Sequence, residues 1–320
     1  MIAKSLLLLS IFFNTFGIGS MSNKFDDAYI NNLNQVSAKS AQASDLDLYL
    51  PTISARPYVK PNAPEATAFA KRYLLADLDS GLILAKDNEH EKVPIASTTK
   101  IMTASIVLEN YKLDDVVTIS ADAVAETGAS IDFQVNEKMT VYNLLKCMLI
   151  KSANGAAYAL AEHMNQGNET GVSTFMGKMN QKAKALGMND TDYHDPAGLD
   201  VTGYSSAYDL LTVTKYALQK PTFAEIVQTK SATVTDVTGR ISLDLQNSNR
   251  LVSDWNYFGA IGVKTGYMPE AGHCLVGAAK RDGHTLVSIV LETDSVAPTA
   301  SAQESQRLLD WGWQNIVWQS

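Results

Sequence analysis

Apolar residues recur with two different periods along the 320-residue chain, and each period predicts a different kind of element. The first clear pattern is a pair of short apolar runs, Tyr73–Leu78 and Leu82–Ala85, separated by the polar segment Asp79–Gly81. Short apolar runs joined by a polar segment that ends in glycine are typical of a β-hairpin. The pattern therefore predicts two antiparallel strands over residues 73–85.

A helical period replaces this pattern between about residues 97 and 230. The first helix is expected over Ser97–Asn110, where apolar residues return at spacings of three and four. The clearest helical face is formed by Val141, Leu144, Leu145, Met148 and Leu149. The polar segment Ser152–Gly155 interrupts this helix, and an alanine-rich helix is predicted to resume over Ala156–Met164.

Strand patterns return after about residue 223. Ser231–Val237 alternates and is rich in β-branched residues, and Gly262 and Val263 lead into a further extended segment. His273–Ala279 and Thr285–Leu291 predict two strands joined by a turn at Asp282-Gly283. A closing helix is expected over Pro298–Trp318. This order predicts an α+β fold, with one antiparallel sheet made from both ends of the chain and a helical subdomain inserted between them.

The N-terminal segment has the pattern of a signal peptide over residues 1–19. Lys4 supplies a positive charge, Leu6–Phe13 is apolar, and Gly17 and Gly19 are small residues before the expected cleavage site. Residues 20–64 are polar, contain several prolines and lack an apolar period, so they predict a partly disordered linker. The folded domain is expected over 65–320. We expect an exported protein, loosely associated with the membrane if the first segment stays uncleaved.

Composition adds two constraints to this picture. The chain is 46% hydrophobic and carries a formal net charge of −8, and no basic run is present, which argues against nucleic acid as a partner. Cys147 and Cys274 are its two cysteines. Export makes a disulfide between them chemically possible, but cysteine is also common in protein cores. Two free core thiols are therefore the favoured interpretation, and the pairing stays open.

Three short motifs carry candidate chemistry: Ser97-Thr-Thr-Lys100, Ser152-Ala-Asn154 and Lys264-Thr265-Gly266. A serine hydroxyl is a weak nucleophile and needs a base. Positions i and i+3 share a helix face, so Lys100 is placed to approach the hydroxyl of Ser97. A lysine acts as a base only when burial or a neighbouring cation lowers its pKa, and Lys264 could be that cation. The motifs therefore predict a serine nucleophile activated by a lysine base.

The three motifs, in this order, resemble the serine–lysine signature of penicillin-binding proteins and serine β-lactamases. The flanking segments Pro94–Ala104, Asp195–Leu199 and Gly262–Tyr267 are similar to those of D-alanyl-D-alanine carboxypeptidases, the low-molecular-weight penicillin-binding proteins. The resemblance covers roughly Ala66–Trp318. It implies a serine β-lactamase/transpeptidase-like fold, with an active site in the groove between the sheet and the helical block.

The resemblance also implies roles for the catalytic residues. Ser97 would form the acyl-enzyme, and Lys100 would be its base. Ser152 would relay a proton to the leaving amine, while Asn154 would accept from Lys100 and donate to the substrate amide. Lys264 would complete the catalytic set.

Substrate binding is assigned in the same way. Thr265, together with Lys264, would hold the terminal carboxylate of the substrate, and Gly266 would let the strand approach it closely. The backbone N–H groups of Ser97 and Tyr267 would form the oxyanion hole. The implied partners are peptidoglycan stem peptides, with β-lactam antibiotics as covalent inhibitors, in the periplasm or the extracytoplasmic envelope. No metal or organic cofactor is implied.

Several alternatives remain open at this point. The favoured activity is a carboxypeptidase that removes the terminal D-Ala from stem pentapeptides, and the alternative is a D-Ala endopeptidase that cuts cross-links. The catalytic motifs do not separate these two activities. The sequence ends soon after the last predicted helix, as in short relatives that include endopeptidases, whereas the flanks of the motifs favour a carboxypeptidase.

A β-lactamase and a non-catalytic wall-binding protein are less favoured. In class A β-lactamases the deacylating glutamate lies about 36 positions after the serine of the second motif, which corresponds here to Met188. Three intact motifs argue against a non-catalytic protein. The chain has no H-E-x-x-H or G-x-S-x-G motif, and His194-Asp195, the best candidate for a metal site, is interpreted as structural.

Overall fold

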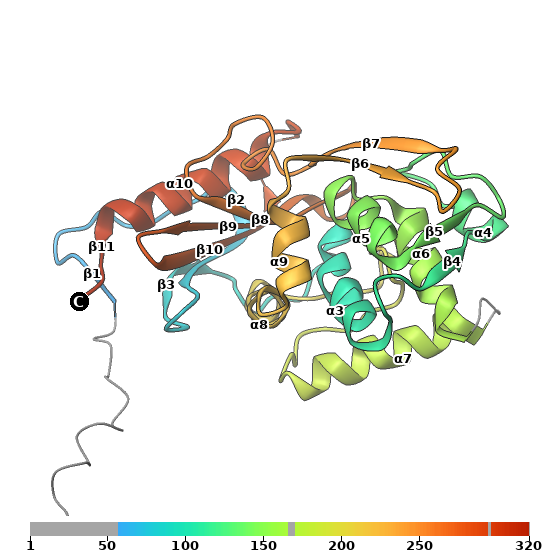
Figure 1. The fold of residues 1–320 in the computed structure, drawn as a ribbon. Coiled ribbons are helices and arrows are strands. Elements are labelled where there is room, and N and C mark those ends of the chain that lie inside the picture. The colour runs from blue at the N-terminus through green and yellow to red at the C-terminus, as the bar shows by residue number, and fades with distance from the viewer. Residues whose placement is uncertain (1–56, 166–169, 294–295, 320) are drawn as a thin grey trace, which may run out of the picture. The chain divides into compact units, whose positions relative to one another are not determined.

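Five strands from both ends of the chain form one antiparallel sheet in the computed structural model, which describes residues 57–165, 170–293 and 296–319 (Figure 1). The order across the sheet is β3-β2-β10-β9-β8, and all neighbours are antiparallel. The strands are β2 (Ala70–Asp77), β3 (Ile83–Asp87), β8 (Ala260–Met268), β9 (Gly272–Arg281) and β10 (His284–Thr293). The predicted hairpin and the predicted α+β fold are therefore confirmed.

Helices lie between these two groups of strands in the sequence, and one further helix follows them. The helices are α3 (Lys100–Asn110), α4 (Ala121–Ala125), α5 (Val141–Ile150), α6 (Asn154–Glu162), α7 (Thr170–Ala185), α8 (Ala207–Leu218), α9 (Pro221–Gln228) and α10 (Ala300–Asn315). Short 3₁₀ turns are η2 (Ala96–Thr99) and η3 (His163–Asn165). Two small hairpins accompany the helical block: β4 (Val116–Thr118) with β5 (Lys138–Thr140), and β6 (Ser231–Thr235) with β7 (Ser242–Gln246).

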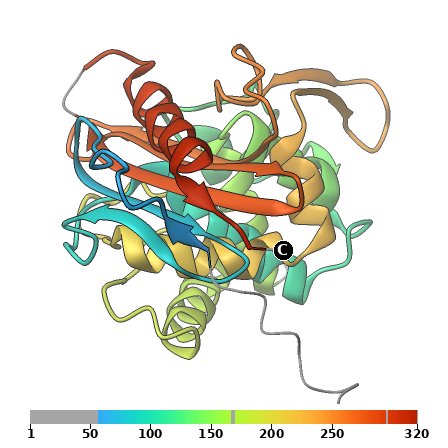
Figure 2. The same ribbon diagram turned by 90° about the vertical axis from the view of Figure 1, so that its left-hand side faces the viewer.

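Both faces of the sheet are covered, α10 lying on one face and α8 on the other (Figures 1 and 2). Successive residues of a strand point to opposite faces. Accordingly, Leu75 and Leu286 pack with Leu309 of α10, whereas their neighbours Leu74 and Val287 belong to the larger core of the helical block. This double burial explains why β10 is a nearly continuous apolar run rather than an alternating one.

Helix α3 lies in the middle of the helical block and carries the first motif at its start. Its first eight residues, Lys100–Val107, are all buried, and it contacts α5, α6, α7 and α8. Because neighbouring helices surround it, α3 is held in place from several sides. The residues at its N-terminal end therefore have a fixed position relative to the sheet.

The two ends of the described chain meet, which corrects two predictions. The predicted closing helix stops at Asn315, and Ile316–Val317 forms strand β11 instead. This strand pairs with β1 (Tyr58–Val59), within the segment predicted to be a linker. Trp311 also donates its indole N–H to the carbonyl of Pro64 at 2.8 Å. Residues 57–64 therefore lie beside the end of α10, held by backbone pairing with β11, by the backbone N–H of Lys60 donating to the carbonyl of Asn315 and by the indole of Trp311. The predicted signal peptide and the linker before residue 57 lie outside the described residues.

Cys147 and Cys274 are both free and buried. Cys147 lies in α5 and Cys274 in β9. Burial raises the pKa of each thiol to about 12. The favoured interpretation of two core thiols is confirmed.

Candidate active site

Ser97 lies in the 3₁₀ turn η2, immediately before α3. The sequence predicts that the helix itself begins at Ser97, but the first turn is wound more tightly and α3 begins at Lys100. Ser97 is half-buried. The Nζ atom of Lys100 lies 2.8 Å from its Oγ atom. The predicted pair of residues is therefore within hydrogen-bond reach.

Lys100 is fully buried and has three polar partners. Its Nζ atom lies 2.8 Å from Ser97 Oγ, from Asn154 Oδ1 and from the carbonyl oxygen of Ala197. Burial lowers the pKa of Lys100 well below its ordinary value, and the charge of Lys264 lowers it further, while Asp195 opposes the shift. A lysine whose pKa is lowered in this way can be neutral near neutral pH and accept a proton.

The second motif lies at the junction between α5 and α6. Ser152 has a positive φ of 68° and is buried. Asn154 is the first residue of α6, so this helix begins earlier than the predicted Ala156. The amide of Asn154 accepts from Lys100 and donates one N–H to the carbonyl of Thr127. Asn154 thus connects Lys100 to the loop that carries Thr127.

The third motif lies on β8, the strand at one edge of the sheet. Lys264 is 1% exposed, and its Nζ atom donates to Ser152 Oγ at 2.9 Å and to the carbonyl of Thr265 at 3.0 Å. Burial lowers the pKa of Lys264 to about 7. The second and third motifs are therefore joined through the contact between Lys264 and Ser152.

Gly266 is required by the close approach of β8 to the turn that carries Ser97. A Cβ atom at this position would lie 2.9 Å from the carbonyl oxygen of Ile95 and 3.3 Å from the backbone nitrogen of Ser97. A close approach of the strand to the substrate is the role expected of Gly266, whereas the crowding in the structure is against the protein's own backbone. This packing fixes the edge strand beside Ser97.

An open groove of about 380 Å³ runs above these residues. Of the predicted site residues, Ser97, Ser152, Thr265, Gly266 and Tyr267 line the groove. The other three, Lys100, Asn154 and Lys264, are buried. Tyr267 is 61% exposed and stacks on His273, with 4.3 Å between the ring centroids.

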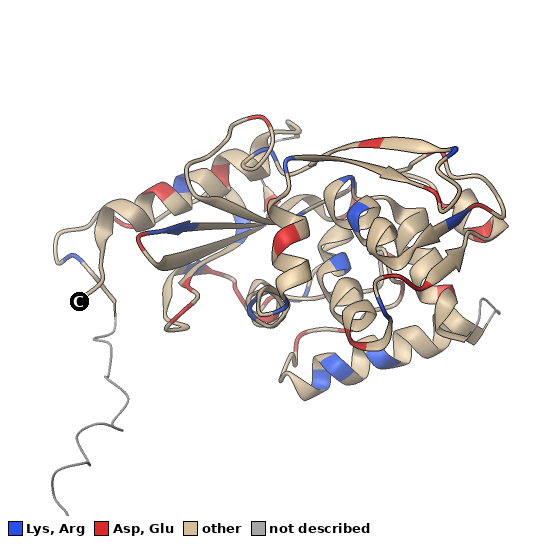
Figure 3. Ribbon diagram, viewed as in Figure 1, with Lys and Arg blue, Asp and Glu red and all other residues tan. Residues whose placement is uncertain are grey.

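Sequence reasoning missed several residues of the groove. Ser248 lines it and lies 2.8 Å from Thr265, hydroxyl to hydroxyl. Lys151 and Arg250 also line it, and no Asp or Glu does among the described residues. Elsewhere Lys and Arg are interspersed with Asp and Glu over the sheet and the helical block (Figure 3). The groove therefore differs from the mixed surface around it and suits a ligand that carries a carboxylate.

The candidate metal ligands are engaged in other contacts. The two ring nitrogens of His194 lie near Thr202 and Asp192, and both carboxylate oxygens of Asp195 accept backbone N–H groups. Asp77, Asp79 and His284 form another group with ligand atoms within 4.8 Å of one another. There, Asp77 accepts from Ser80 and from the indole of Trp318, Asp79 accepts the backbone N–H of Thr285, and His284 stacks on Trp318. These contacts explain both groups without an ion.

The arrangement is suited to acyl transfer from a peptide-like strand. A serine hydroxyl faces a buried lysine of lowered pKa. A second lysine, Lys264, and the hydroxyl of Thr265 lie on the edge strand beside it, and the hydroxyl of Ser248 lies 2.8 Å from that of Thr265. The free edge of β8 can pair with an extended ligand through backbone groups. A carboxylate at the end of that ligand would lie near Thr265 and Lys264.

Comparisons with known proteins agree with this geometry. Residues 59–295 match the family model described as D-alanyl-D-alanine carboxypeptidase. The chain is 34% identical over 250 residues to the D-alanyl-D-alanine carboxypeptidase DacF of Bacillus subtilis, an alignment that covers 76% of this chain but only 62% of DacF. It is also 34% identical to a D-alanyl-D-alanine endopeptidase of Haemophilus influenzae, over 74% of this chain and 79% of that protein.

A solved structure shares the fold. The Streptomyces K15 DD-transpeptidase superposes with a TM-score of 0.73 at 34% sequence identity, and the match covers 78% of this chain and 99% of the transpeptidase. The predicted serine β-lactamase/transpeptidase-like architecture is therefore confirmed.

Proposed function

The chain belongs to the D-alanyl-D-alanine carboxypeptidase family, and we propose that it removes the terminal D-Ala from peptidoglycan stem pentapeptides through an acyl-enzyme on Ser97. The observation that carries this proposal is the contact between Ser97 and the buried Lys100 at the base of a groove bordered by Thr265. A nucleophile, its base and a carboxylate site thus border one cavity.

In the acylation step, Ser97 Oγ attacks the carbonyl carbon of the penultimate D-Ala, and its proton passes to Lys100 Nζ. The backbone N–H groups of Ser97 and Tyr267 hold the negative oxygen of the tetrahedral intermediate, a contribution of about 3–4 kcal/mol per donor. When the peptide bond breaks, the leaving amine receives a proton through Ser152. D-Ala departs, and the ester on Ser97 remains.

Lys264 and Thr265 bind the carboxylate of the departing D-Ala. The pKa of Lys264, about 7 in the free protein because of burial, rises when a carboxylate comes within contact distance, because an opposite charge favours the ammonium form. Substrate binding therefore stabilises the positive charge of Lys264, which burial otherwise disfavours.

In the second half of the reaction, water adds to the ester carbonyl and releases the shortened stem peptide from Ser97. A β-lactam would acylate Ser97 in the same way. Met188, at the position of the class A glutamate, is a buried apolar residue, and no carboxylate lines the groove among the described residues. These features support slow hydrolysis of a penicilloyl-enzyme, and hence inhibition rather than resistance.

An endopeptidase activity on cross-linked dimers is the second candidate, supported by the similarity to the Haemophilus influenzae endopeptidase. Digestion of purified monomeric pentapeptide and of cross-linked dimer, followed by mass spectrometry, distinguishes the two activities. We expect release of D-Ala from the monomer at least about tenfold faster than cleavage of the dimer. If the dimer is cleaved as fast as the monomer or faster, the proposed activity becomes that of an endopeptidase rather than a carboxypeptidase.

We also propose that the protein works outside the cytoplasm, in the periplasm or cell envelope, where its substrate lies. The support is the signal-peptide pattern of residues 1–19. Among the described residues, no helix has the length and hydrophobicity needed to cross a bilayer. Detection of the mature N-terminus by mass spectrometry after cell fractionation would test export and cleavage together.

A further inference from the structure

The loop of residues 195–200 has no part in the chemistry proposed above, although it packs directly against the turn that carries Ser97. The loop is organised around the carboxylate of Asp195, which is buried with 8% exposure. One carboxylate oxygen accepts the backbone N–H groups of Ala197 and Gly198, each at 2.7 Å. The other accepts those of Leu199 and Asp200, each at 2.8 Å. A single side chain therefore fixes four consecutive backbone groups.

The loop held in this way presents one backbone carbonyl to the base. The carbonyl oxygen of Ala197 lies 2.8 Å from Lys100 Nζ, and the carbonyl of the preceding residue, Pro196, accepts from Thr103 Oγ1 at 2.6 Å. Lys100 and Thr103 both belong to helix α3, so these two carbonyl groups join the loop to that helix. The direction of the Ala197 carbonyl thus depends on the four hydrogen bonds to Asp195.

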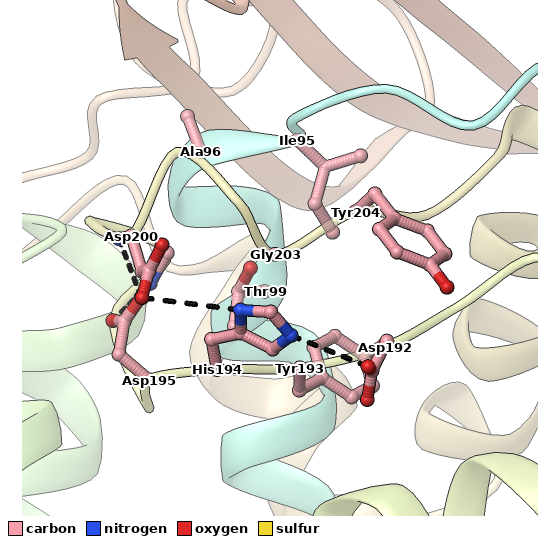
Figure 4. Close-up of a pocket in the computed structure, with 11 residues that line it drawn as sticks. Ile95, Ala96, Thr99, Asp192, Tyr193, His194, Asp195, Asp200, Gly203 and Tyr204 are labelled. Carbon is pink, nitrogen blue, oxygen red and sulfur yellow. Dashed lines mark hydrogen bonds and ion pairs between the residues drawn. The ribbon is translucent and has the colours of Figure 1, made fainter.

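Little free space separates the loop from the nucleophile turn. A Cβ atom at Gly198, whose φ is +78°, would lie only 2.0 Å from the carbonyl oxygen of Ala96. The cavity that remains between them is about 10 Å³ and is lined by Ala96, Thr99, His194 and Asp195, among others (Figure 4). Space of this size holds at most about one water molecule. A displacement of the loop would therefore be felt at Ala96 and Lys100.

We propose that Asp195 is a positioning residue for Lys100: through the turn that it holds, it aims the Ala197 carbonyl at Lys100 Nζ and so keeps this amine directed at Ser97 Oγ. The proposal rests on the proposed function, in which Lys100 is the base. Asp195 itself does not line the groove. It should therefore affect the rate of acylation much more than the binding of substrate.

The charge of Asp195 adds a second effect that can be measured. The charged groups that face Lys100 are Lys264, from β8, and Asp195, from the loop, and its remaining partners are neutral. Burial and then the charge of Asp195 also raise the pKa of Glu126 and of Tyr158 nearby. Removing the negative charge should lower the pKa of Lys100, because the ammonium form loses a stabilising neighbour.

The test is a stopped-flow measurement, over a range of pH, of the rate at which a fluorescent penicillin acylates the full-length protein. In Asp195→Ala we expect the first-order acylation constant to fall about 10- to 100-fold, as for a reacting group displaced by a fraction of an ångström. The non-covalent affinity for penicillin should change by less than about threefold. Asp195→Asn keeps one oxygen for two of the four N–H groups and should recover most of the lost rate.

The pH profile separates this role from a purely structural one. The acid limb is the part of the pH profile in which the rate of acylation falls as the pH is lowered. In Asp195→Ala and Asp195→Asn it should move to lower pH, because a Lys100 of lower pKa stays neutral at lower pH. Asp209→Ala is the matched control. Asp209, in α8, is a buried carboxylate that accepts the backbone N–H of Asp190 and the hydroxyl of Thr191, a few residues before the loop, and its hydrogen bonds within the described residues do not reach Lys100. The Asp209→Ala variant should have a lower thermal stability than the wild type, but the acid limb of its acylation should stay at the wild-type pH.

Three results would overturn the inference. The first is a folded Asp195→Ala protein that is acylated within about twofold of the wild-type rate. The second is a loss of rate that Asp209→Ala shares, with no movement of the acid limb in either variant. The third is a wild-type protein that penicillin does not acylate, which would overturn the proposed function and this inference with it.

Discussion

Replacing Lys264 tests the electrostatic design of the site most directly. In the structure its ammonium group is buried, touches Ser152 and the backbone of Thr265, and lowers the pKa of Lys100. Lys264→Met removes the charge but keeps most of the side-chain volume, so it avoids the cavity that Lys264→Ala would leave. Both variants should lose activity, and the methionine variant should remain the more stable of the two.

The size of the loss follows from two contributions. A charge-assisted hydrogen bond to the substrate carboxylate is worth about 1.5–3 kcal/mol. Loss of the neighbouring positive charge raises the pKa of Lys100, and each unit of that rise costs about 1.4 kcal/mol when the neutral amine is the reactive form. Together they amount to roughly 3–4 kcal/mol, which corresponds to a fall in kcat/KM of about 10²-fold or more.

Steady-state kinetics on diacetyl-Lys-D-Ala-D-Ala, measured across pH, would check both parts. Besides the lower kcat/KM, the acid limb should move to higher pH, the opposite direction from the Asp195 variants. Lys280→Ala, an exposed lysine on the adjacent strand β9, is the matched control and should change kcat/KM by less than about twofold. A Lys264→Met enzyme within that same range would refute the assigned role.

Three further outcomes are expected from the same site. Fluorescent penicillin should label the wild-type protein but neither Ser97→Ala nor Lys100→Met, while both variants stay folded by circular dichroism. The penicilloyl-enzyme should persist for minutes in intact-mass measurements, and rapid turnover of a chromogenic cephalosporin would contradict this. The kcat/KM profile should fall at acid pH as Lys100 becomes protonated, and at alkaline pH as Lys264, with a pKa of about 7, loses its charge. In the pH profile of kcat, the fall on the alkaline side should occur at higher pH than in kcat/KM, because the bound carboxylate favours the ammonium form of Lys264.

The sequence predicted those parts of the fold that depend on apolar periodicity. Helix α5 is predictable because Val141–Leu149 presents one apolar face, and strands β9 and β10 because two short apolar runs flank an Asp-Gly turn. The ends of elements were less accurate. Periodicity does not distinguish a 3₁₀ turn from an α-helix at Ser97, nor a helix from a short strand at Ile316–Val317. At Ser97 the tighter winding of the first turn gives a 3₁₀ helix. At Ile316–Val317 pairing with the distant strand β1 gives a β-strand.

The predicted site residues came from motifs, and they do lie together in the structure. The missing contacts are of a kind that a motif cannot reveal. Ser248 is a single serine in a polar segment, and only its proximity to Thr265 makes it part of the site. The Ala197 contact uses a backbone carbonyl, which any residue could provide. The one available signal was Asp195–Leu199, a segment recognised by resemblance but given no role.

The contacts of Lys100 explain why a site with three separate motifs also needs this fourth segment. A buried amine that must be neutral at one step and charged at the next cannot be paired with a full negative charge at contact distance, because such a pair would hold it protonated. The structure gives it neutral acceptors instead, including the Ala197 carbonyl, and keeps the carboxylate of Asp195 occupied by four backbone N–H groups. The positive charge of Lys264 and the negative charge of Asp195 then act on the pKa of Lys100 in opposite directions. Asp195 also orients the amine through the turn that it holds, so variants at Lys264 and Asp195 should move the acid limb in opposite directions while both slow acylation.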